Sequence, residues 1–137
     1  MKRLLAWIPS LLIVGLGVVG AQATLSNEDH PKLMKANAQA VGALNKAIGS
    51  GAFADARTQV ATLRQNFTSL QGFWMGKKKE DAVLILKDGL TRLDALDRLL
   101  AAPTVDQMAA QAAAKEFAGN TCGACHKQYR EGDAQTG

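Results

Sequence analysis

The stretch Cys122-Gly123-Ala124-Cys125-His126, near the carboxyl end, determines how the rest of the sequence is interpreted. On a helix, residues three and four positions apart lie on one face, so Cys122, Cys125 and His126 would project together. The two residues between the cysteines are small and leave the space between the thiols open. Cys-x-x-Cys-His is the attachment pattern of c-type heme, in which two thiols bond the porphyrin and the imidazole binds its iron. The sequence therefore predicts one covalently bound heme c with His126 as an axial ligand.

Three other interpretations of the two cysteines remain open. They could form a thiol redox pair, half of a zinc site or a disulfide. A redox pair usually follows a strand, and no strand pattern is visible here. A zinc site would need His30 from the far end of the chain, because the sequence has only two cysteines and two histidines. A disulfide leaves His126 unexplained, so heme attachment accounts for the most residues.

The amino terminus has the features of a secretory signal peptide over residues 1–23. Lys2 and Arg3 precede an apolar run from Leu4 to Gly20, and Ala21-Gln22-Ala23 provides a small-x-small cleavage site. An uncleaved anchor is the alternative, since the run is just long enough to span a bilayer, although the proline and glycines within it disfavour that. We therefore expect cleavage after Ala23, a mature domain over 24–137, and a periplasmic location, outside the cytoplasm, where heme c is attached.

The composition favours helices and gives no ground for nucleic-acid binding. Hydrophobic residues make up 47% of the 137 residues and aromatic residues only 5%, which is typical of packed helices. Of the 16 Lys and Arg residues, all but Lys2 and Arg3 would remain after cleavage, leaving 14 against 12 acidic residues, a net charge of +2. Two heme propionates would neutralise that excess. No phosphate-binding loop or metalloprotease motif is present, and we expect no enzymatic activity.

Hydrophobic periodicity predicts four helices, at about 31–48, 55–71, 79–101 and 104–131. Gly49-Ser50-Gly51 ends the first, Pro103 ends the third, and Thr104-Val-Asp-Gln107 is typical of a capping box for the fourth. The short connections predict an all-α fold, an antiparallel up-down-up-down four-helix bundle with the heme near the end of the fourth helix. The expected core positions are Met34, Ala38, Val41, Leu44 and Ile48, then Ala56, Val60, Leu63, Phe67 and Leu70, then Val83, Leu86, Leu90, Leu93, Leu96 and Leu100.

In such a bundle the start of the first helix, the end of the fourth and the connection 72–78 share one pole. Phe73, Trp74 and Met75 of that connection would then lie beside the heme. Met34 lies one turn into the first helix and would face His126 across the ring. We therefore expect these segments to converge around the cofactor.

Met34 is the candidate second axial ligand, which would give a Met/His pair, although a methionine on a helix face is usually part of the core. Met75 lies at the same pole, whereas Met108 starts the fourth helix and belongs to the opposite one. His30, one turn before Met34, is expected to be a helix-start residue or a partner for a heme propionate.

The chain resembles the class II c-type cytochromes, the cytochrome c prime family, whose heme motif lies near the carboxyl end of a four-helix bundle. Cys122-Gly-Ala-Cys125-His126-Lys-Gln-Tyr129-Arg130 matches the family pattern Cys-x-x-Cys-His-x-x-aromatic-Arg. Lys32-Leu-Met34-Lys-Ala-Asn37 resembles the first helix of the low-spin branch, in which a methionine completes the coordination. The high-spin branch leaves that site open behind an apolar residue. The resemblance implies Met34 ligation, and the connection 72–78 is shorter than the family's usual link.

Further residues at this pole have more than one interpretation. Tyr129 is expected to pack on the heme ring or to close the core. Arg130 could pair with a propionate, as a guanidinium pairs well with carboxylates, or complement the helix dipole. Lys77-Lys78-Lys79 is either a solvated turn or a docking surface for an acidic redox partner.

The function that these features predict is that of a periplasmic monoheme electron carrier, with other redox proteins as partners. The alternative is a five-coordinate protein that binds nitric oxide or carbon monoxide at an open sixth site. A small peroxidase would need a distal His or Arg, and His30 is poorly placed for that role. We expect no nucleic-acid partner and no membrane span after cleavage; family members often dimerise through the first two helices, so a homodimer is an option.

Overall fold

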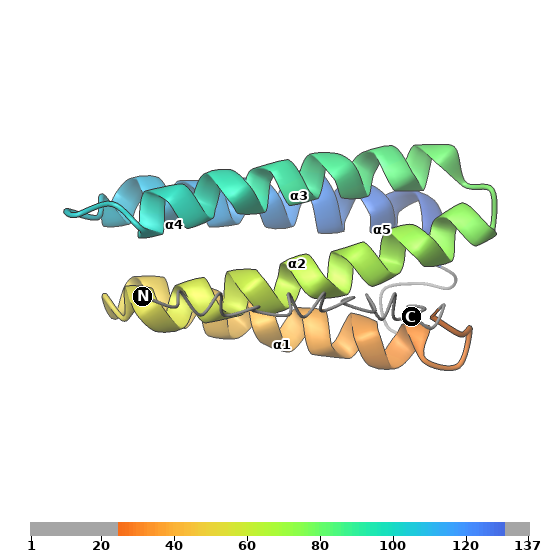
Figure 1. Cartoon of the computed structure of the whole chain (residues 1–137), viewed down its shortest axis with the longest axis horizontal. Coiled ribbons are helices and arrows are strands. Elements are labelled where there is room, and N and C mark those ends of the chain that lie inside the picture. Colours follow the sequence, from red (N-terminus) through yellow and green to blue (C-terminus); the bar gives the residue numbers. More distant parts are fainter. Residues whose placement is uncertain (1–24, 131–137) are drawn as a thin grey trace, which may run out of the picture.

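The computed structural model describes residues 25–130, and these residues are helical apart from the connections (Figure 1). The predicted signal peptide, the predicted end of the fourth helix at Glu131 and the tail beyond it lie outside the described residues. Within residues 25–130 there is no strand, so the all-α prediction is confirmed. The elements are α1 (His30–Gly49), α2 (Phe53–Gly76), α3 (Glu80–Leu100), α4 (Gln107–Phe117), a π-helix η1 (Ala118–Gly123) and α5 (Ala124–Tyr129).

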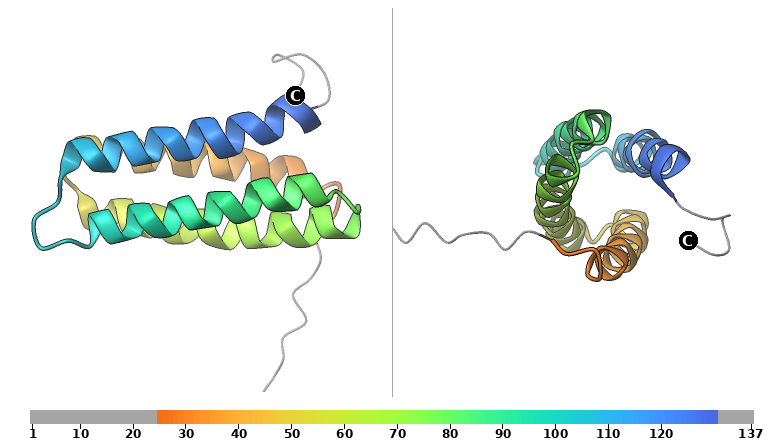
Figure 2. Two further views of the ribbon diagram at one scale, coloured as in Figure 1. Left: turned by 90° about the horizontal axis from the view of Figure 1, so that it is seen from above. Right: turned by 90° about the vertical axis from the view of Figure 1, so that its right-hand side faces the viewer.

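Four long helical segments lie side by side, the fourth being formed by α4, η1 and α5 in succession (Figures 1 and 2). Short connections at 50–52, 77–79 and 101–106 join them at alternate ends of the molecule. α2 packs against both α1 and α3, while α4 packs against α3 and α1. No helix among the described residues is both long and apolar enough to cross a membrane.

The connections follow from local chemistry at the helix ends. Gly51 has φ 75°, a left-handed conformation that glycine adopts without strain, and it turns the chain from α1 into α2. The Gln107 side chain donates from Nε2 to the carbonyl oxygens of Ile48 at 2.7 Å and Gly49 at 3.0 Å. The first residue of α4 therefore caps the end of α1 and holds these two ends together.

The predicted capping box at Thr104 is wrong. The N-cap of α4 is Asp106, whose side chain accepts a hydrogen bond from Ala109 N at 3.0 Å. Aspartate is among the preferred N-cap residues. The Gln107 side chain donates to carbonyl oxygens at the end of α1 and so does not cap its own helix. The N-cap accordingly lies two residues later than the capping box predicts.

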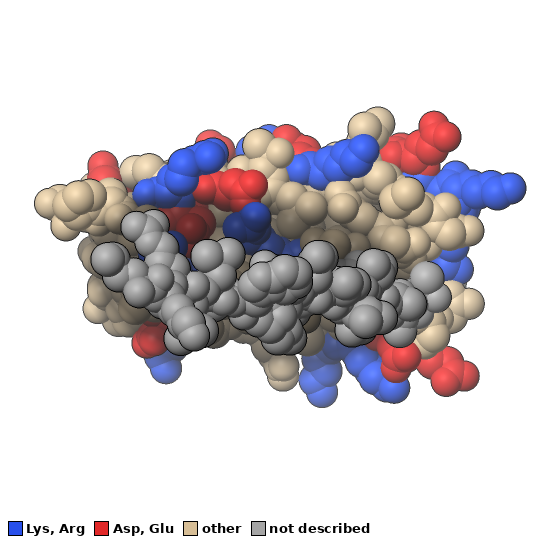
Figure 3. Space-filling view, in the orientation of Figure 1, with Lys and Arg blue, Asp and Glu red and all other residues tan. Residues whose placement is uncertain are grey.

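Charged side chains lie on the outside of the bundle and link neighbouring helices (Figure 3). Arg57 near the start of α2 donates from Nε and Nη2 to the Asp97 carboxylate near the end of α3, at 2.8 and 3.2 Å. Arg92 of α3 lies 3.7 Å from Glu116 of α4. Exposed pairs of this kind contribute about 0–1 kcal/mol each, so they help to set the alignment of the helices, whereas the core supplies most of the stability.

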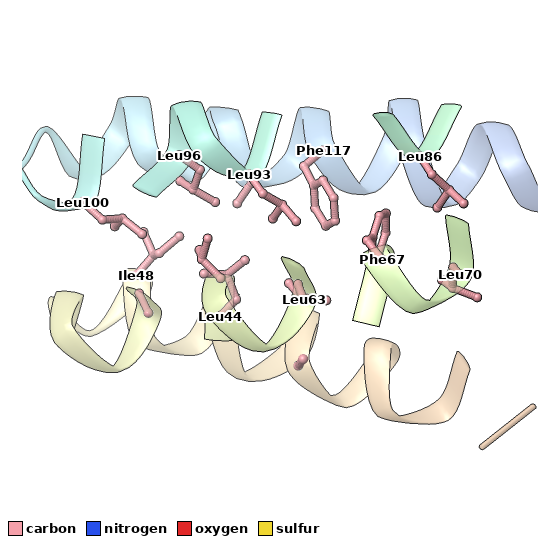
Figure 4. Packing of buried hydrophobic residues seen from close by; sticks show 14 of the residues in the cluster. Leu44, Ile48, Leu63, Phe67, Leu70, Leu86, Leu93, Leu96, Leu100 and Phe117 are labelled. Atoms are coloured by element: carbon pink, nitrogen blue, oxygen red, sulfur yellow. The ribbon is translucent and has the colours of Figure 1, made fainter. Parts of the chain in front are cut away.

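The core runs along the centre of the bundle (Figure 4), and the predicted face of α2 is confirmed because all five of its positions are buried. On α3, Leu86, Leu93, Leu96 and Leu100 are buried, whereas Val83 and Leu90 are partly buried. Phe67 of α2 and Phe117 of α4 pack with ring centroids 5.3 Å apart. The hydrophobic periodicity of α2 therefore identified the side of the helix that faces the interior.

The predicted core face of α1 is wrong at Ala38, which is exposed. Asn37 and Ala40 are buried instead. Asn37 can be buried because its Oδ1 accepts a hydrogen bond from Asn66 Nδ2 of α2 at 2.8 Å, which satisfies the amide. A polar residue on the inner face cannot be recognised from hydrophobic spacing alone, so the pattern selected Ala38 in place of its neighbour Asn37, whereas the predicted Leu44 and Ile48 are buried.

The predicted connection over 72–78 is also shorter in the structure. α2 continues to Gly76, so Phe73, Trp74 and Met75 are helical, and only residues 77–79 form the turn. Phe73 and Trp74 are buried, and their burial against other helices extends α2 by more than a turn. The resulting turn is held by backbone hydrogen bonds to Trp74 O from Lys77 N at 3.1 Å and from Lys79 N at 3.0 Å.

α3 and η1 approach closely at Gly89. A Cβ atom at Gly89 would clash with the Thr121 methyl group and lie 3.1 Å from Phe67 Cε1. Thr121 is buried, its hydroxyl has no hydrogen-bond partner among the described residues, and it immediately precedes Cys122. The missing side chain at position 89 thus lets the cysteine-bearing segment sit against α3.

Gly89→Ala should destabilise the protein by about 1–3 kcal/mol because the added methyl group overpacks this contact. That loss should outweigh the gain of about 1 kcal/mol in helix propensity. The matched control is Gly42→Ala in α1, where nothing lies within 4 Å of the added atom, and which should be neutral or stabilising. Thermal unfolding followed by circular dichroism measures both; equal stability of the two variants would contradict the close approach.

Candidate functional site

Cys122 lies in η1, whereas Cys125 and His126 lie in α5. The prediction assumed one continuous α-helix through all three, so it missed the π-helical segment that precedes and includes Cys122. π-helical turns close i→i+5 hydrogen bonds and are frequent at functional sites. Both cysteines are half-buried and free, and His126 is exposed. The motif therefore lies at a change of helical pitch, with its imidazole accessible.

The environment of the two thiols favours their protonated form. Burial raises the pKa of the Cys122 thiol above its ordinary value. Burial also raises the pKa of the Cys125 thiol, with smaller contributions from Cys122 and the Asp81 carboxylate. Thiol exchange and zinc binding both require the thiolate, so this environment fits neither of those interpretations well. Within residues 25–130, no three His, Cys, Asp or Glu side chains are grouped so as to hold a metal ion.

An aromatic cluster joins three helices at the same end of the bundle. His30, at the start of α1, stacks on Phe73 of α2 with ring centroids 4.6 Å apart. Trp74 meets Phe73 edge-on at 5.2 Å and lies 4.8 Å from the Tyr129 ring of α5. The sequence-based expectation that the start of the first helix, residues 73–74 and the end of the fourth helix converge is confirmed by these contacts.

His30 has an unsatisfied nitrogen inside this cluster. Its Nε2 atom is buried and has no hydrogen-bond partner among the described residues. Burial lowers the pKa of His30 below its ordinary value, and the positive charges of Lys77 and His126 lower it further. The imidazole is thus held largely uncharged near the motif, with a free nitrogen that a bound group could use.

The methionines differ in their surroundings. Met34 is partly buried and packs against the core cluster. Met75 is 64% exposed and Met108 is 81% exposed, the latter near the start of α4 at the opposite end of the bundle. Of these candidates only Met34 has its side chain directed toward the interior, which favours it over Met75 as the residue opposite His126.

Tyr129 has a partner that the sequence did not reveal. Its hydroxyl donates to the Asp81 carboxylate in the first turn of α3, which raises the pKa of Tyr129 to about 12 and lowers that of Asp81. The Tyr129 ring packs on Trp74, so this residue helps to close the core in the described structure. Arg130 follows α5, and its backbone N–H donates to His126 O at 3.1 Å.

The residues at this end fit a heme c group. The donor set consists of two free, protonated thiols at the attachment spacing, an accessible imidazole beside them and an orphaned imidazole nitrogen on α1. α5 packs against α3 and η1, and Figure 2 shows it at the end of the fourth helical segment. The Trp74 ring contacts both His30 of α1 and Tyr129 of α5.

An open cleft of about 380 Å³ lies at the same end, between residues 25–27 and the last turns of α2. Gly72, Phe73 and Gly76 form its α2 wall, and Lys77 of the following turn also lines it. The cleft is not lined by either cysteine or by His126, so we do not assign the cofactor to it.

Comparison with known proteins gives no match: no protein-family model, no curated protein and no solved structure is significantly similar to this chain. The interpretation of the site therefore rests on its residues and their geometry.

Proposed function

We propose that this chain is an antiparallel up-down-up-down four-helix bundle of the class II c-type cytochrome kind, and that it carries one covalent heme c and transfers electrons in the periplasm. One observation carries the proposal. Two free, half-buried thiols and an accessible imidazole in a Cys-x-x-Cys-His spacing lie at the end of the bundle where an aromatic cluster joins α1, α2 and α5.

Each residue then has a defined task. Cys122 and Cys125 would form the thioether bonds, His126 would bind the iron, and Met34 of α1 would be its second protein ligand. When bound, heme c supplies one-electron iron chemistry, with a potential that the axial ligands and burial set. Phe73 and Trp74 exclude water from this end because both are buried. A thioether ligand and a dry surrounding both favour the ferrous state and so raise the potential.

A five-coordinate protein that binds nitric oxide or carbon monoxide is the second candidate. It is favoured by the packing of Met34 against the core, because a methionine that only fills space would leave the sixth position open. The two functions differ in the spin state of the iron and in its access to carbon monoxide.

The first test is covalent attachment. Protein exported by a host that attaches heme c should show, in denaturant, the mass of the chain from residue 24 plus one heme, and heme absorbance should migrate with the polypeptide. The Cys122→Ser, Cys125→Ser double variant is the control and should lose the covalent group. An intact chain with two free thiols or a disulfide would remove the basis of the proposed function.

A further inference from the structure

Residues 77–79 form the whole α2–α3 turn, and all three are exposed lysines. Lys78 has φ 57°, a left-handed conformation that is uncommon for a residue with a side chain. Two of the turn's backbone N–H groups donate to Trp74 O, at 3.1 Å from Lys77 and 3.0 Å from Lys79. These hydrogen bonds to Trp74 hold the backbone of the turn, and thus the starting points of its three lysine side chains, in place.

The lysines of this turn make no ion pair with any residue between 25 and 130. Lys77 Nζ lies 4.8 Å from the centroid of the Phe73 ring, and Lys79 Nζ lies 5.9 Å from that of Tyr129. A ring face attracts an ammonium group without neutralising it. In contrast, Lys32 pairs with Asp29, and Arg57 with Asp97. The turn differs from the other lysines without an ion pair, such as Lys46 and Lys115, because it brings three consecutive ammonium groups together.

The surroundings of the turn add to this positive surface. Lys127 and Arg130 of the α5 end are exposed, and blue side chains project at this end of the molecule (Figure 3). Asp29 is paired with Lys32, whereas Asp81, which accepts from Tyr129, and Glu80 are exposed carboxylates beside the turn. Met75, 64% exposed, provides an apolar side chain next to the basic turn.

We propose that the Lys77–Lys79 turn, with Met75 beside it, is the docking surface for a redox protein with an acidic face. The inference rests on the proposed function, since it names the partner of the same site. An exposed methionine with charges around it is typical of a protein interface, and complementary charge steers a partner onto such a patch. Lys79 contacts Tyr129, three residues beyond His126, so a protein bound here lies over the heme-bearing segment. The bound heme would exchange one electron with the redox centre of the partner, and no proton or group would be transferred.

The docking surface can be mapped without electron transfer. Hexacyanochromate(III), a redox-inert paramagnetic trianion, should broaden the amide NMR signals of residues 77–79 and 129 of the reduced holoprotein before those of other residues. Broadening centred on Lys46 or Lys115 in the other half of the bundle, or spread evenly over the surface, would overturn the proposal.

Kinetics with charged oxidants test the same surface. The Lys77→Gln, Lys78→Gln, Lys79→Gln variant should be oxidised by ferricyanide about tenfold more slowly at low ionic strength, the lower end of measured steering effects. The difference should vanish near 1 M salt, where the Debye length is only about 3 Å. Lys46→Gln, Arg98→Gln, Lys115→Gln removes the same net charge elsewhere and should have a smaller effect.

The remaining outcomes separate this inference from the proposed function. A protein without heme absorbance has no heme that ferricyanide could oxidise, and then the proposed function fails. Heme-loaded variants whose rates fall equally in the two triple substitutions would overturn the docking surface alone. Binding to vesicles of phosphatidylcholine and phosphatidylglycerol that the 77–79 variant loses would assign the turn to a membrane surface, which also overturns it.

Discussion

Met34→Ala should convert a low-spin heme iron into a high-spin iron that binds carbon monoxide when reduced. A thioether opposite His126 is a strong enough ligand to keep the iron low-spin, to produce a weak sulfur-to-iron band in the far red when oxidised, and to exclude the gas. Its removal opens the sixth position and lowers the potential, because Met/His ligation raises it. Truncating a buried methionine costs about 2–5 kcal/mol, and Met34 is only partly buried, so the fold should survive.

Met75→Ala and Met108→Ala are the matched controls, because these methionines are 64% and 81% exposed, and neither should change the spectrum. A wild-type protein that is already high-spin and binds carbon monoxide would contradict Met34 ligation and favour the gas-binding alternative. A low-spin spectrum that Met34→Ala leaves unchanged would point to His30, whose Nε2 is buried without a partner. His30→Ala then becomes the variant that opens the site.

The parts of the fold that the sequence predicted are those in which burial coincides with apolar character. The buried face of α2 was predicted correctly because every inward position from Ala56 to Leu70 is hydrophobic. The buried leucines of α3 were predicted for the same reason. α1 was misread at Ala38 because its inner face includes Asn37, and only the three-dimensional pairing with Asn66 makes that position buried. The two faces of an alanine-rich helix differ little in hydrophobicity. One polar residue on the inner face is therefore enough to make the prediction wrong at a neighbouring position.

The helix ends and the π-helix were not predicted because they depend on contacts between residues that are far apart in the sequence. α2 extends to Gly76 because Phe73 and Trp74 are buried against other elements, and α4 begins after Asp106 because Gln107 bonds to α1. η1 has no sequence signal that separates i→i+5 from i→i+4 hydrogen bonding; the fit of Thr121 against Gly89 is visible only in the structure.

The residues of the candidate site could be predicted from the sequence, but their contacts in three dimensions could be predicted only in part. The spacing of Cys122, Cys125 and His126 is local, and the convergence of α1, α2 and α5 follows from helix order and length. The partner of Tyr129 was missed because Asp81 lies on another helix. The one available signal was that Asp81 is an acidic residue in the first turn of a helix at that pole. This signal is ambiguous, because an acidic residue in a first turn also complements the helix dipole.

Heme-free protein should be much less stable than the heme-loaded form, with the loss concentrated at one end of the bundle. The thioether bonds keep the heme on the unfolded chain too, but its contacts with the core form only in the native state. A native-state ligand at an effective concentration of a thousand times its Kd stabilises by about 4 kcal/mol. For a domain of this size that corresponds to a melting temperature lower by about 15–30 °C. Without the group, His30 keeps an unsatisfied nitrogen and the two cysteines keep half-buried, protonated thiols, so this end has the least to lose on opening.

Thermal unfolding and amide hydrogen exchange of the Cys122→Ala, Cys125→Ala variant measure both parts of this expectation. Amides of α5 and the first turn of α1 should exchange rapidly, while those near Leu44, Ile48 and Leu96 should stay protected, because these side chains are completely buried among the helices. Wild-type protein produced without heme attachment is the control, and its melting temperature should match that of the double variant, since the cofactor and not the thiol groups supplies the stability. A heme-free form as stable as the loaded one would mean that the cofactor lies outside the packed core, and then the thiols would face a surface group and not the interior between α1 and α5.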